Sequence, residues 1–485
     1  MSISKISPAP LYHLIGIGGT AMASLAGLLR GLGFRVQGSD GPIYPPMSGV
    51  LAAMDVTVFE GYDPAQLWPA PDRVVVGNAI SRGNVELEAV LDRDLPYCSM
   101  SALLFDAVLR ERQRLVVSGT HGKTTTTSLA AWLLFRAGRE PGWMIGGQPL
   151  DLPSNQHWGR AGGAFVVEGD EYDTAYFDKA PKFFHYRPQR LVVNAVEFDH
   201  ADIYDSLEAI ELQFRRLVNI VPSSGRIAVC GDDAGAQRVV ASASSELVTF
   251  GIGARPAKSR GEPDFWVPEW SERDDGLDFQ LRIRGQAQGE WRLGVLGDFN
   301  LRNAVAALAL VEGLGGTAES NRSALAEFHG VRRRLELRGR PAGVAVYDDF
   351  AHHPTAVAGS VESLRKKKEG GGRLIAIVEP RSWTLRRRIF EAELSTALVG
   401  ADLALVAPVY RPDRLDDEIR MDPRRVVAGL EAQGGRGEAP ESIAAIIERV
   451  VSWARPGDRV LVMSNGGFEA LHDRLIAALD EARGG

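Results

Sequence analysis

The stretch RLVVSGTHGKTTTTSLAAWLL, residues 114–134, predicts a buried strand, a glycine loop and a helix in direct succession. The strand is indicated by the apolar run at residues 115–117, and the helix by Leu129, Trp132 and Leu133, which recur at the spacing of one helical face. The sequence G-x-x-G-K-T lies between them. Such a loop offers backbone N–H groups, a helix N-terminus and a lysine to the charge of a triphosphate. The succession therefore predicts an α/β unit with a nucleotide phosphate site.

Within this loop, Lys123 is expected to contact phosphate oxygens and the hydroxyl of Thr124 to ligate Mg²⁺. The spacing departs from the standard Walker A motif, because Val117 stands six residues before the lysine where a glycine is usual. The alternative is an ordinary strand-to-helix turn with a solvated lysine, but the flanking strand and helix favour the phosphate site. The residues expected around ATP in this loop are Gly119, Thr120, His121, Gly122, Lys123, Thr124 and Thr125.

Two further residues are candidates for a magnesium site beside the loop. Glu168 ends the apolar strand in AFVVE, and His200 follows LVVN within EFDH. Mg²⁺ prefers oxygen ligands and needs only one or two carboxylates. Both residues follow predicted strands, at the sheet edge where open α/β folds place their sites. A helix cap for the glutamate and a satisfied polar residue for the histidine are the alternatives.

The rest of the chain repeats the alternation of strand and helix. LYHLIGIGG, FRVQGSD and RVVVGN predict strands of a doubly wound α/β domain before the charged linker RERQR. Another such unit begins near VAVYDDF, and the period-two passages around residues 254–293 predict an added antiparallel sheet. We expect an α/β chain of three domains, covering residues 1–112, 113–331 and 332–485.

A second nucleotide motif lies near the N-terminus, where GIGGTA fits the turn G-x-G-x-x-G/A. Asp40 follows the next predicted strand. Such a turn brings backbone amides against a diphosphate, and an acid at that strand end can hold a ribose. NAD carries both groups, and so does a UDP-sugar. A tight turn without a ligand is the third possibility.

Composition excludes several other classes of protein. The chain has 485 residues, 45% of them hydrophobic, and a net charge of −7, so neither global disorder nor nucleic-acid binding is indicated. Cys98 and Cys230 are the only cysteines and are far apart, which gives no disulfide framework or zinc site. The N-terminus lacks a signal-peptide pattern, and no apolar run is long enough to span a membrane. We expect a cytoplasmic protein without a membrane partner.

The passages SGTHGKTTTT, VEGDEYDTAYFD, EFDHADIY, GDFNLRNA, RRRLELRG and YDDFAHHPT resemble the Mur ligases, and the likeness runs from HLIGIGGTAM to MSNGGF. The resemblance implies an ATP- and Mg²⁺-dependent enzyme that joins a carboxylate on a UDP-sugar to an amine. It implies a Rossmann-like N-terminal domain for the UDP-sugar and a P-loop central domain for ATP. A Rossmann-like C-terminal domain would present the amine, in a monomer or homodimer.

Several passages favour one branch of this family. YPPMS, GNAISRGN, FDKAPKFFHYRP, EPRS and MSNGGF resemble the branch that attaches recovered L-Ala-γ-D-Glu-meso-diaminopimelate to UDP-N-acetylmuramate, in peptidoglycan recycling. The branch that attaches L-alanine is the nearest alternative. An NAD-dependent oxidoreductase would leave GTHGKT unexplained. A non-catalytic nucleotide sensor would bind nucleotide without releasing phosphate when all substrates are present.

The resemblance also implies roles for single residues. Lys123, Glu168 and His200 would be catalytic, the last two as metal ligands beside Thr124. Phe299 stands where the family often has a histidine. The remaining ATP contacts would be Asn300 to adenine, Arg334 to phosphate and Asp349 to ribose. The UDP-sugar would contact Gly16, Gly18, Gly19, Thr20, Asp40 and Asn78, and the peptide His352, His353, Arg381, Ser382, Ser464 and Asn465.

The chemistry expected of such a site is activation of an unreactive acid. A carboxylate resists attack by an amine because it is anionic and has a poor leaving group. Transfer of the γ-phosphoryl group of ATP to the lactyl carboxylate makes an acyl phosphate, which the amine of the peptide can attack. The protein would contribute positioning and charge stabilisation.

Overall fold

The computed structural model describes residues 9–43, 47–201, 203–254, 261–366 and 371–484. Residues 1–8 of the N-terminus and the first three residues of the YPPMS passage lie outside the described residues. Within the described ranges, no helix has both the length and the apolar composition needed to cross a membrane.

The chain divides into two compact units, and each unit is made of segments that are separate in the sequence. The glycine turn and the phosphate loop belong to unit 1, and most of the predicted amine-binding residues belong to unit 2. Unit 1 comprises Met1–Val196, Glu208–Phe250 and Ala306–Asn321, and unit 2 comprises Glu197–Leu207, Gly251–Val305 and Arg322–Gly485.

Unit 1 begins with a parallel sheet in the order β3-β2-β1-β4-β5. The order reverses between β1 and β4, whose carboxyl ends therefore form a switch point, where sheets of this kind bind ligands. α1 starts immediately after the glycine turn and buries its apolar face. The elements are β1 Leu11–Ile15, α1 Thr20–Gly31, β2 Arg35–Asp40, α2 Met47–Ala53, β3 Thr57–Glu60, β4 Arg73–Val76, α3 Val85–Asp92, β5 Tyr97–Ser99 and α4 Met100–Leu104, with short helices at Pro64–Leu67 and Phe105–Leu109.

The second sheet of unit 1 surrounds the strand predicted at residues 115–117. Strands β14-β13-β12-β6-β9-β7 are parallel in this order, and β8 is antiparallel to β7. Helix α5 follows β6 directly, which confirms the predicted strand, loop and helix. The elements are β6 Gln113–Ser118, α5 Lys123–Arg136, β7 Gly142–Met144, β8 Gln156–His157, β9 Ala164–Gly169, β10 Asp173–Ala175, β11 Asp178–Pro181, α6 Lys182–Tyr186, β12 Arg190–Val193, α7 Leu207–Asn219, β13 Arg226–Cys230, α8 Ala234–Val240 and β14 Glu246–Ile252.

Unit 2 contains the antiparallel strands predicted from the period-two passages. β17 pairs with β15, β16 and β18, and its inward side chains Leu277, Phe279 and Leu281 are buried, as alternation requires. The elements are β15 Phe265–Val267, β16 Trp270–Arg273, β17 Gly276–Ile283 and β18 Gln286–Leu293, followed by α9 Asp298–Val311 and α10 Ala318–Ala326.

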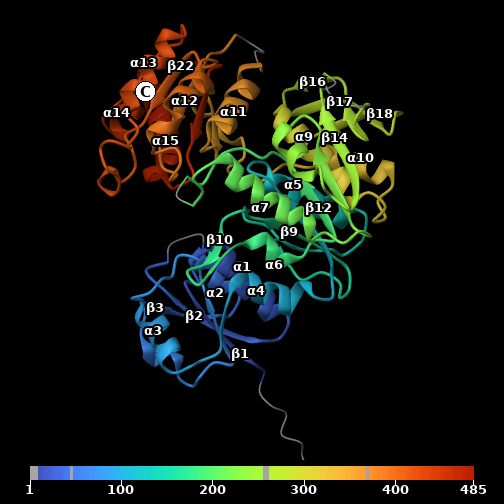
Figure 1. Cartoon of the computed structure of the whole chain (residues 1–485). Helices are drawn as coiled ribbons and strands as arrows, with labels where there is room; N and C mark the ends of the chain where they lie inside the picture. Colours follow the sequence, from blue (N-terminus) through green and yellow to red (C-terminus); the bar gives the residue numbers. More distant parts are fainter. Residues whose placement is uncertain (1–8, 44–46, 202, 255–260, 367–370, 485) are drawn as a thin grey trace, which may run out of the picture. The chain divides into compact units, whose positions relative to one another are not determined.

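The C-terminal part of unit 2 is a three-layer α/β sandwich (Figure 1). Its sheet has the order β19-β20-β24-β21-β22-β23, parallel except for β19. Helices α11, α12 and α13 supply one buried cluster, and α14 and α15 supply the other. The elements are β19 Glu336–Gly339, β20 Ala345–Asp349, α11 Pro354–Lys366, β21 Leu374–Val378, α12 Glu391–Leu398, β22 Leu403–Val406, α13 Pro423–Ala432, β23 Gly437–Glu438, α14 Ile443–Trp453, β24 Arg459–Met463 and α15 Leu471–Gly484, with short helices at Pro341–Gly343, Arg388–Phe390, Pro412–Arg414 and Phe468–Ala470.

Candidate functional site

The phosphate loop joins the end of β6 to the start of α5 and needs both of its glycines. Gly119 and Gly122 have φ angles of 130° and 78°, in the region that favours glycine. A Cβ on Gly119 would lie 3.0 Å from the Cβ of Asn194, and the amide of Thr120 donates to the carbonyl of Ala195 over 2.7 Å. The loop is therefore held against the end of β12. The first amides of a helix lack intrahelical acceptors, and α5 presents them at this loop.

Lys123 lies at the centre of the loop and is held by two acceptors. Its Nζ donates to the carbonyl of Gly119 over 2.8 Å and to a carboxylate oxygen of Glu171 over 2.7 Å. Burial alone lowers the pKa of Lys123, but the carboxylates of Glu171 and Asp170 outweigh it and the net pKa is raised. The lysine is thus a buried, fully charged cation. Sequence reasoning missed Glu171, although the acidic run GDEYD after Glu168 was an available signal.

Thr124 and Glu168, two of the three expected magnesium ligands, are adjacent in unit 1. The hydroxyl of Thr124 donates to one carboxylate oxygen of Glu168 over 2.9 Å, and the amide of Gly146 donates to the other. A hydroxyl and a carboxylate are hard oxygen donors, so the pair fits Mg²⁺. His200, the third expected ligand, belongs to unit 2.

The N-terminal glycine turn is fixed by Asp40. The amides of Gly18 and Gly41 donate to its two carboxylate oxygens over 2.7 and 2.8 Å, and the hydroxyl of Tyr62 donates over 3.1 Å. Burial, together with that carboxylate, raises the pKa of Tyr62 to about 12. Asn78 is exposed just after β4, across the switch point from the turn. Asp40 thus shapes the turn, and its contact with a ribose stays a prediction.

Seven of the residues predicted for ATP or peptide binding follow the carboxyl ends of three neighbouring strands of unit 2. The order β20-β24-β21 places these strand ends side by side. The amide of Ser464 donates to the carbonyl of Asp349 over 3.0 Å, and the hydroxyl of Ser382 donates to the carbonyl of His352 over 3.2 Å. The seven are Asp349, His352 and His353 after β20, Ser464 and Asn465 after β24, and Arg381 and Ser382 after β21.

Asp349 is buried and satisfied by the backbone. Its carboxylate accepts from the amides of Leu335 and Ala351, each over 2.7 Å. Burial raises the pKa of Asp349 to about 6, against the opposing charge of Arg334. The guanidinium carbon of that arginine lies 5.0 Å from the ring centroid of Phe350. The expected contacts of Asp349 and Arg334 with ATP stay predictions.

The remaining predicted adenine contact lies on α9. Asn300 is buried, and its amide donates to the carbonyl of Leu296 over 2.7 Å. The neighbouring Phe299 packs against the core cluster beneath α11 and lies close to Gly359. The partly buried phenylalanine at this position therefore extends the apolar core of unit 2.

A buried acid that the sequence did not indicate lies beside three predicted histidines in unit 2. Asp199 accepts from the hydroxyl of Thr384 over 2.6 Å and from the amide of His200 over 2.7 Å. Burial raises the pKa of Asp199, but the charges of His200 and His352, the hydrogen bond from Thr384 and the charge of His353 outweigh it, and the net pKa is lowered. Asp199 therefore remains an anion among these histidines.

Arginines gather after β21 and β22, near the predicted peptide residues. Arg386 is buried, with its guanidinium carbon 4.2 Å from the ring centroid of Trp383 and its Nη1 donating to the carbonyl of Tyr410 over 3.1 Å. Burial, and then the charge of Arg414, lowers its pKa. The guanidinium carbon of Arg381 lies 3.7 Å from the ring centroid of Tyr410. Stacked arginines of this kind are suited to carboxylates.

Comparison with known proteins gives matches along most of the chain. Three family models match: "Mur ligase family, catalytic domain" at residues 11–112, "Mur ligase middle domain" at 117–311 and "Mur ligase, glutamate ligase domain" at 333–466. The chain is 41% identical to the UDP-N-acetylmuramate–L-alanyl-γ-D-glutamyl-meso-2,6-diaminoheptandioate ligase of Escherichia coli K12, covering 96% of this chain and 98% of that protein. It is 37% identical to the ligase of the same name from Haemophilus influenzae, with the same coverage. A murein peptide ligase structure from Psychrobacter arcticus has 35% identity and a TM-score of 0.70, covering 97% of this chain and 99% of that one.

Proposed function

Because the chain belongs to the Mur ligase family, we propose that it joins UDP-N-acetylmuramate to L-alanyl-γ-D-glutamyl-meso-diaminopimelate. The chain is an ATP-dependent amide ligase with the three-domain Mur ligase fold. Family membership accounts for both nucleotide motifs, so an oxidoreductase or a nucleotide sensor is no longer needed to explain them. The proposed substrates rest on the full-length similarity to two ligases whose names specify them.

The ATP-dependent chemistry is supported chiefly by three adjacent residues. Lys123 and Thr124 begin α5 after the phosphate loop, and Glu168 lies near the end of β9. The lysine supplies a buried positive charge for phosphate oxygens, and the adjacent hydroxyl and carboxylate would hold Mg²⁺. When bound, Mg²⁺ neutralises charge on the β- and γ-phosphates and orients them. When ATP binds, its phosphates would compete with Glu171 for Lys123. The loop would then stabilise charge as the lactyl carboxylate of the sugar attacks the γ-phosphorus, the bond to the β,γ-bridging oxygen breaks, and ADP leaves an acyl phosphate on the sugar.

The second step joins the amine to the activated acid. The free amine of the peptide's L-alanine attacks the acyl carbon, and phosphate leaves through a tetrahedral intermediate. The peptide carries carboxylates on D-glutamate and diaminopimelate, and the cluster of Arg381, Arg386 and Arg414 in unit 2 would bind them. Alanine alone carries one carboxylate and would offer fewer partners to this cluster, in which Arg381 already pairs with Glu379 over 3.5 Å. The cluster therefore favours the acidic peptide.

The remaining assignments of this proposal follow the three domains expected from the sequence. Residues 1–112 would bind the UDP-sugar, residues 113–331 ATP, and residues 332–485 the peptide. His200 would complete the Mg²⁺ ligands from the segment between β12 and α7. The enzyme would act in the cytoplasm, where ATP and UDP-sugars are available, as a monomer or homodimer.

Phosphate release from ATP tests the proposal directly. Purified chain in magnesium buffer receives ATP and UDP-N-acetylmuramate, with the tripeptide in one reaction and L-alanine in a second. We expect release that requires both the sugar and the tripeptide, with much lower kcat/KM for L-alanine, and a product mass equal to the two substrates less water. A higher kcat/KM for L-alanine would assign the chain to the alanine-adding branch. Release independent of any amine would contradict an amide ligase of either kind.

A further inference from the structure

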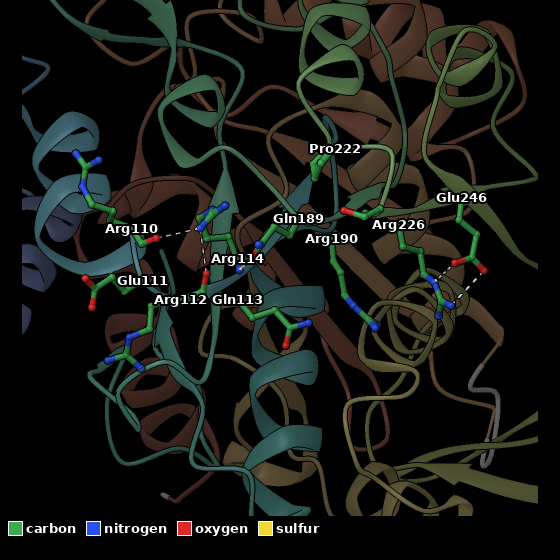
Figure 2. A pocket seen from close by; sticks show the side chains of 12 residues that line it. Arg110, Glu111, Arg112, Gln113, Arg114, Gln189, Arg190, Pro222, Arg226 and Glu246 are labelled. Carbon is green, nitrogen blue, oxygen red and sulfur yellow. Dashed lines mark hydrogen bonds and ion pairs between the residues drawn. The ribbon is translucent and has the colours of Figure 1, made fainter.

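A polar cavity of about 560 Å³ lies in unit 1 at the amino ends of the parallel strands (Figure 2). The first residues of β6, β12, β13 and β14 line it, together with the linker before β6 and the turn before β13. The phosphate loop follows the carboxyl end of β6, so the two sites lie at opposite edges of one sheet. At about 3.3 Å per residue, the six residues of β6 separate them by about 20 Å.

The lining of the cavity is rich in arginine, in a chain whose net charge is −7. Its lining contains five arginines, at 110, 112, 114, 190 and 226, and two glutamates, at 111 and 246. Arg226 is neutralised by Glu246 over 2.9 Å and by Glu312 over 2.7 Å, and Arg110 is paired with Asp106. The pairing of these two arginines leaves three whose charge has to be explained.

Arg112, Arg114 and Arg190 donate to backbone carbonyls and form no ion pair with a described residue. Burial lowers the pKa of each, and the charge of Arg187 lowers the pKa of Arg114 further. For Arg190, the charge of Arg226 also lowers the pKa, while the charges of Glu312 and Glu246 raise it without reversing the net shift. Arg112 is only 4% exposed, and its Nη2 is buried without a hydrogen-bond partner among the described residues. An arginine needed only for packing would be expected to have its charge balanced, as Arg226 has.

The guanidinium groups are held in place rather than free to move. The guanidinium carbon of Arg112 lies 4.2 Å from the ring centroid of Trp158, and Nη1 of Arg114 donates to three carbonyls of the preceding turn. Nη1 of Arg190 donates to two further carbonyls. Fixed arginines lose little entropy when they bind an anion, which favours a built site over a fluctuating surface. Figure 2 shows these groups spread along the cavity, not gathered at one point.

We propose that this cavity binds an elongated small anion carrying two or more phosphate groups, at a site separate from the ATP loop. Arg112 and Arg114 have no acidic partner among the described residues, and Glu312 and Glu246 offset the charge of Arg190 only in part. Their planar forks suit phosphate oxygens. The spacing of the guanidinium groups along the cavity suits a chain of phosphates better than a single ion. The proposal does not depend on the ligase assignment, because it rests on the opposite edge of the sheet.

Calorimetric titration of the full chain with inorganic tripolyphosphate tests this site. The titration is run with EDTA present and repeated after saturation with the inert ATP analogue AMP-PNP. We expect one binding event that persists in the presence of AMP-PNP and weakens at least tenfold in Arg114→Gln and in Arg190→Gln. Arg93→Gln removes an exposed arginine elsewhere in unit 1 and should leave that event unchanged. Equal affinity in all variants, or a single event abolished by AMP-PNP, would overturn the proposal.

Two further measurements keep the test decisive. Hydrogen exchange of the wild-type chain should slow at residues 110–114 and 222–226 when tripolyphosphate is added, which needs no variant to fold. Unchanged exchange in those segments during saturable binding would place the ligand elsewhere. Citrate serves as a carboxylate probe of similar charge. Binding of citrate more tightly than tripolyphosphate would overturn the assignment to phosphate compounds.

Discussion

Replacing Lys123 with alanine is expected to destabilise the folded chain as well as to stop catalysis. The Nζ of Lys123 lies 2.7 Å from a carboxylate oxygen of Glu171, and the two side chains are 13% and 1% exposed. Removing the lysine takes away the positive charge 2.7 Å from the buried carboxylate of Glu171. Breaking a buried pair in this way costs about 3–5 kcal/mol. Against a typical stability of about 5–15 kcal/mol, that loss is large enough to lower the urea midpoint of unfolding clearly.

The double variant Lys123→Met/Glu171→Gln separates stability from catalysis. Both charges are removed, so no uncompensated ion remains, and a neutral replacement of a buried pair is often close to energetically neutral. We expect urea unfolding, followed by circular dichroism, to recover most of the lost stability while phosphate release stays absent. The reasoning is refuted if Lys123→Ala unfolds at the wild-type urea midpoint. It is also refuted if the stability lost by the double variant equals the sum of the losses in the single variants Lys123→Met and Glu171→Gln.

Three other substitutions test the site. Thr124→Val should raise the Mg²⁺ concentration needed for half-maximal phosphate release at least tenfold, because it removes a hydroxyl 2.9 Å from the neighbouring carboxylate, whereas Thr127→Val on the same helix should not. Asp349→Asn should remove a pH dependence of stability, because the pKa of Asp349 is about 6 in the folded protein against 3.8 for the free group. The wild-type acid favours folding below pH 4, and this contribution of up to about 3 kcal/mol is lost as the pH rises through 6. The difference in melting temperature between the two proteins should therefore change between pH 4 and pH 6. Gly119→Ala should weaken ATP binding, measured by calorimetry, because its Cβ would lie 3.0 Å from an asparagine side chain. Gly138→Ala, at a φ of 69° with open space around it, is the control for backbone strain alone, and equal ATP affinity in both variants would contradict the steric argument.

Local patterns in the sequence were sufficient to predict these strands and helices and the phosphate loop. The run 114–134 predicts the strand, loop and helix because burial, helical spacing and glycine conformation are all properties of neighbouring residues. The same locality placed Glu168 at a strand end, where the structure has it. It also predicted the antiparallel strands of unit 2, because a period of two reflects burial of one face of a sheet.

Only the tertiary structure decided which partners these side chains meet. The sequence offered Asp40 as a ribose ligand, which stays a prediction, and the fold shows that its carboxylate also accepts hydrogen bonds from the amides of Gly18 and Gly41. The pairing of Lys123 with Glu171 depends on residues dozens of positions apart, and so does the gathering of arginines from three strands and a linker at one cavity. Periodicity along a chain reports which face of an element is buried. Charge compensation depends on distances through space, which sheet order and packing set and which no short stretch of sequence contains.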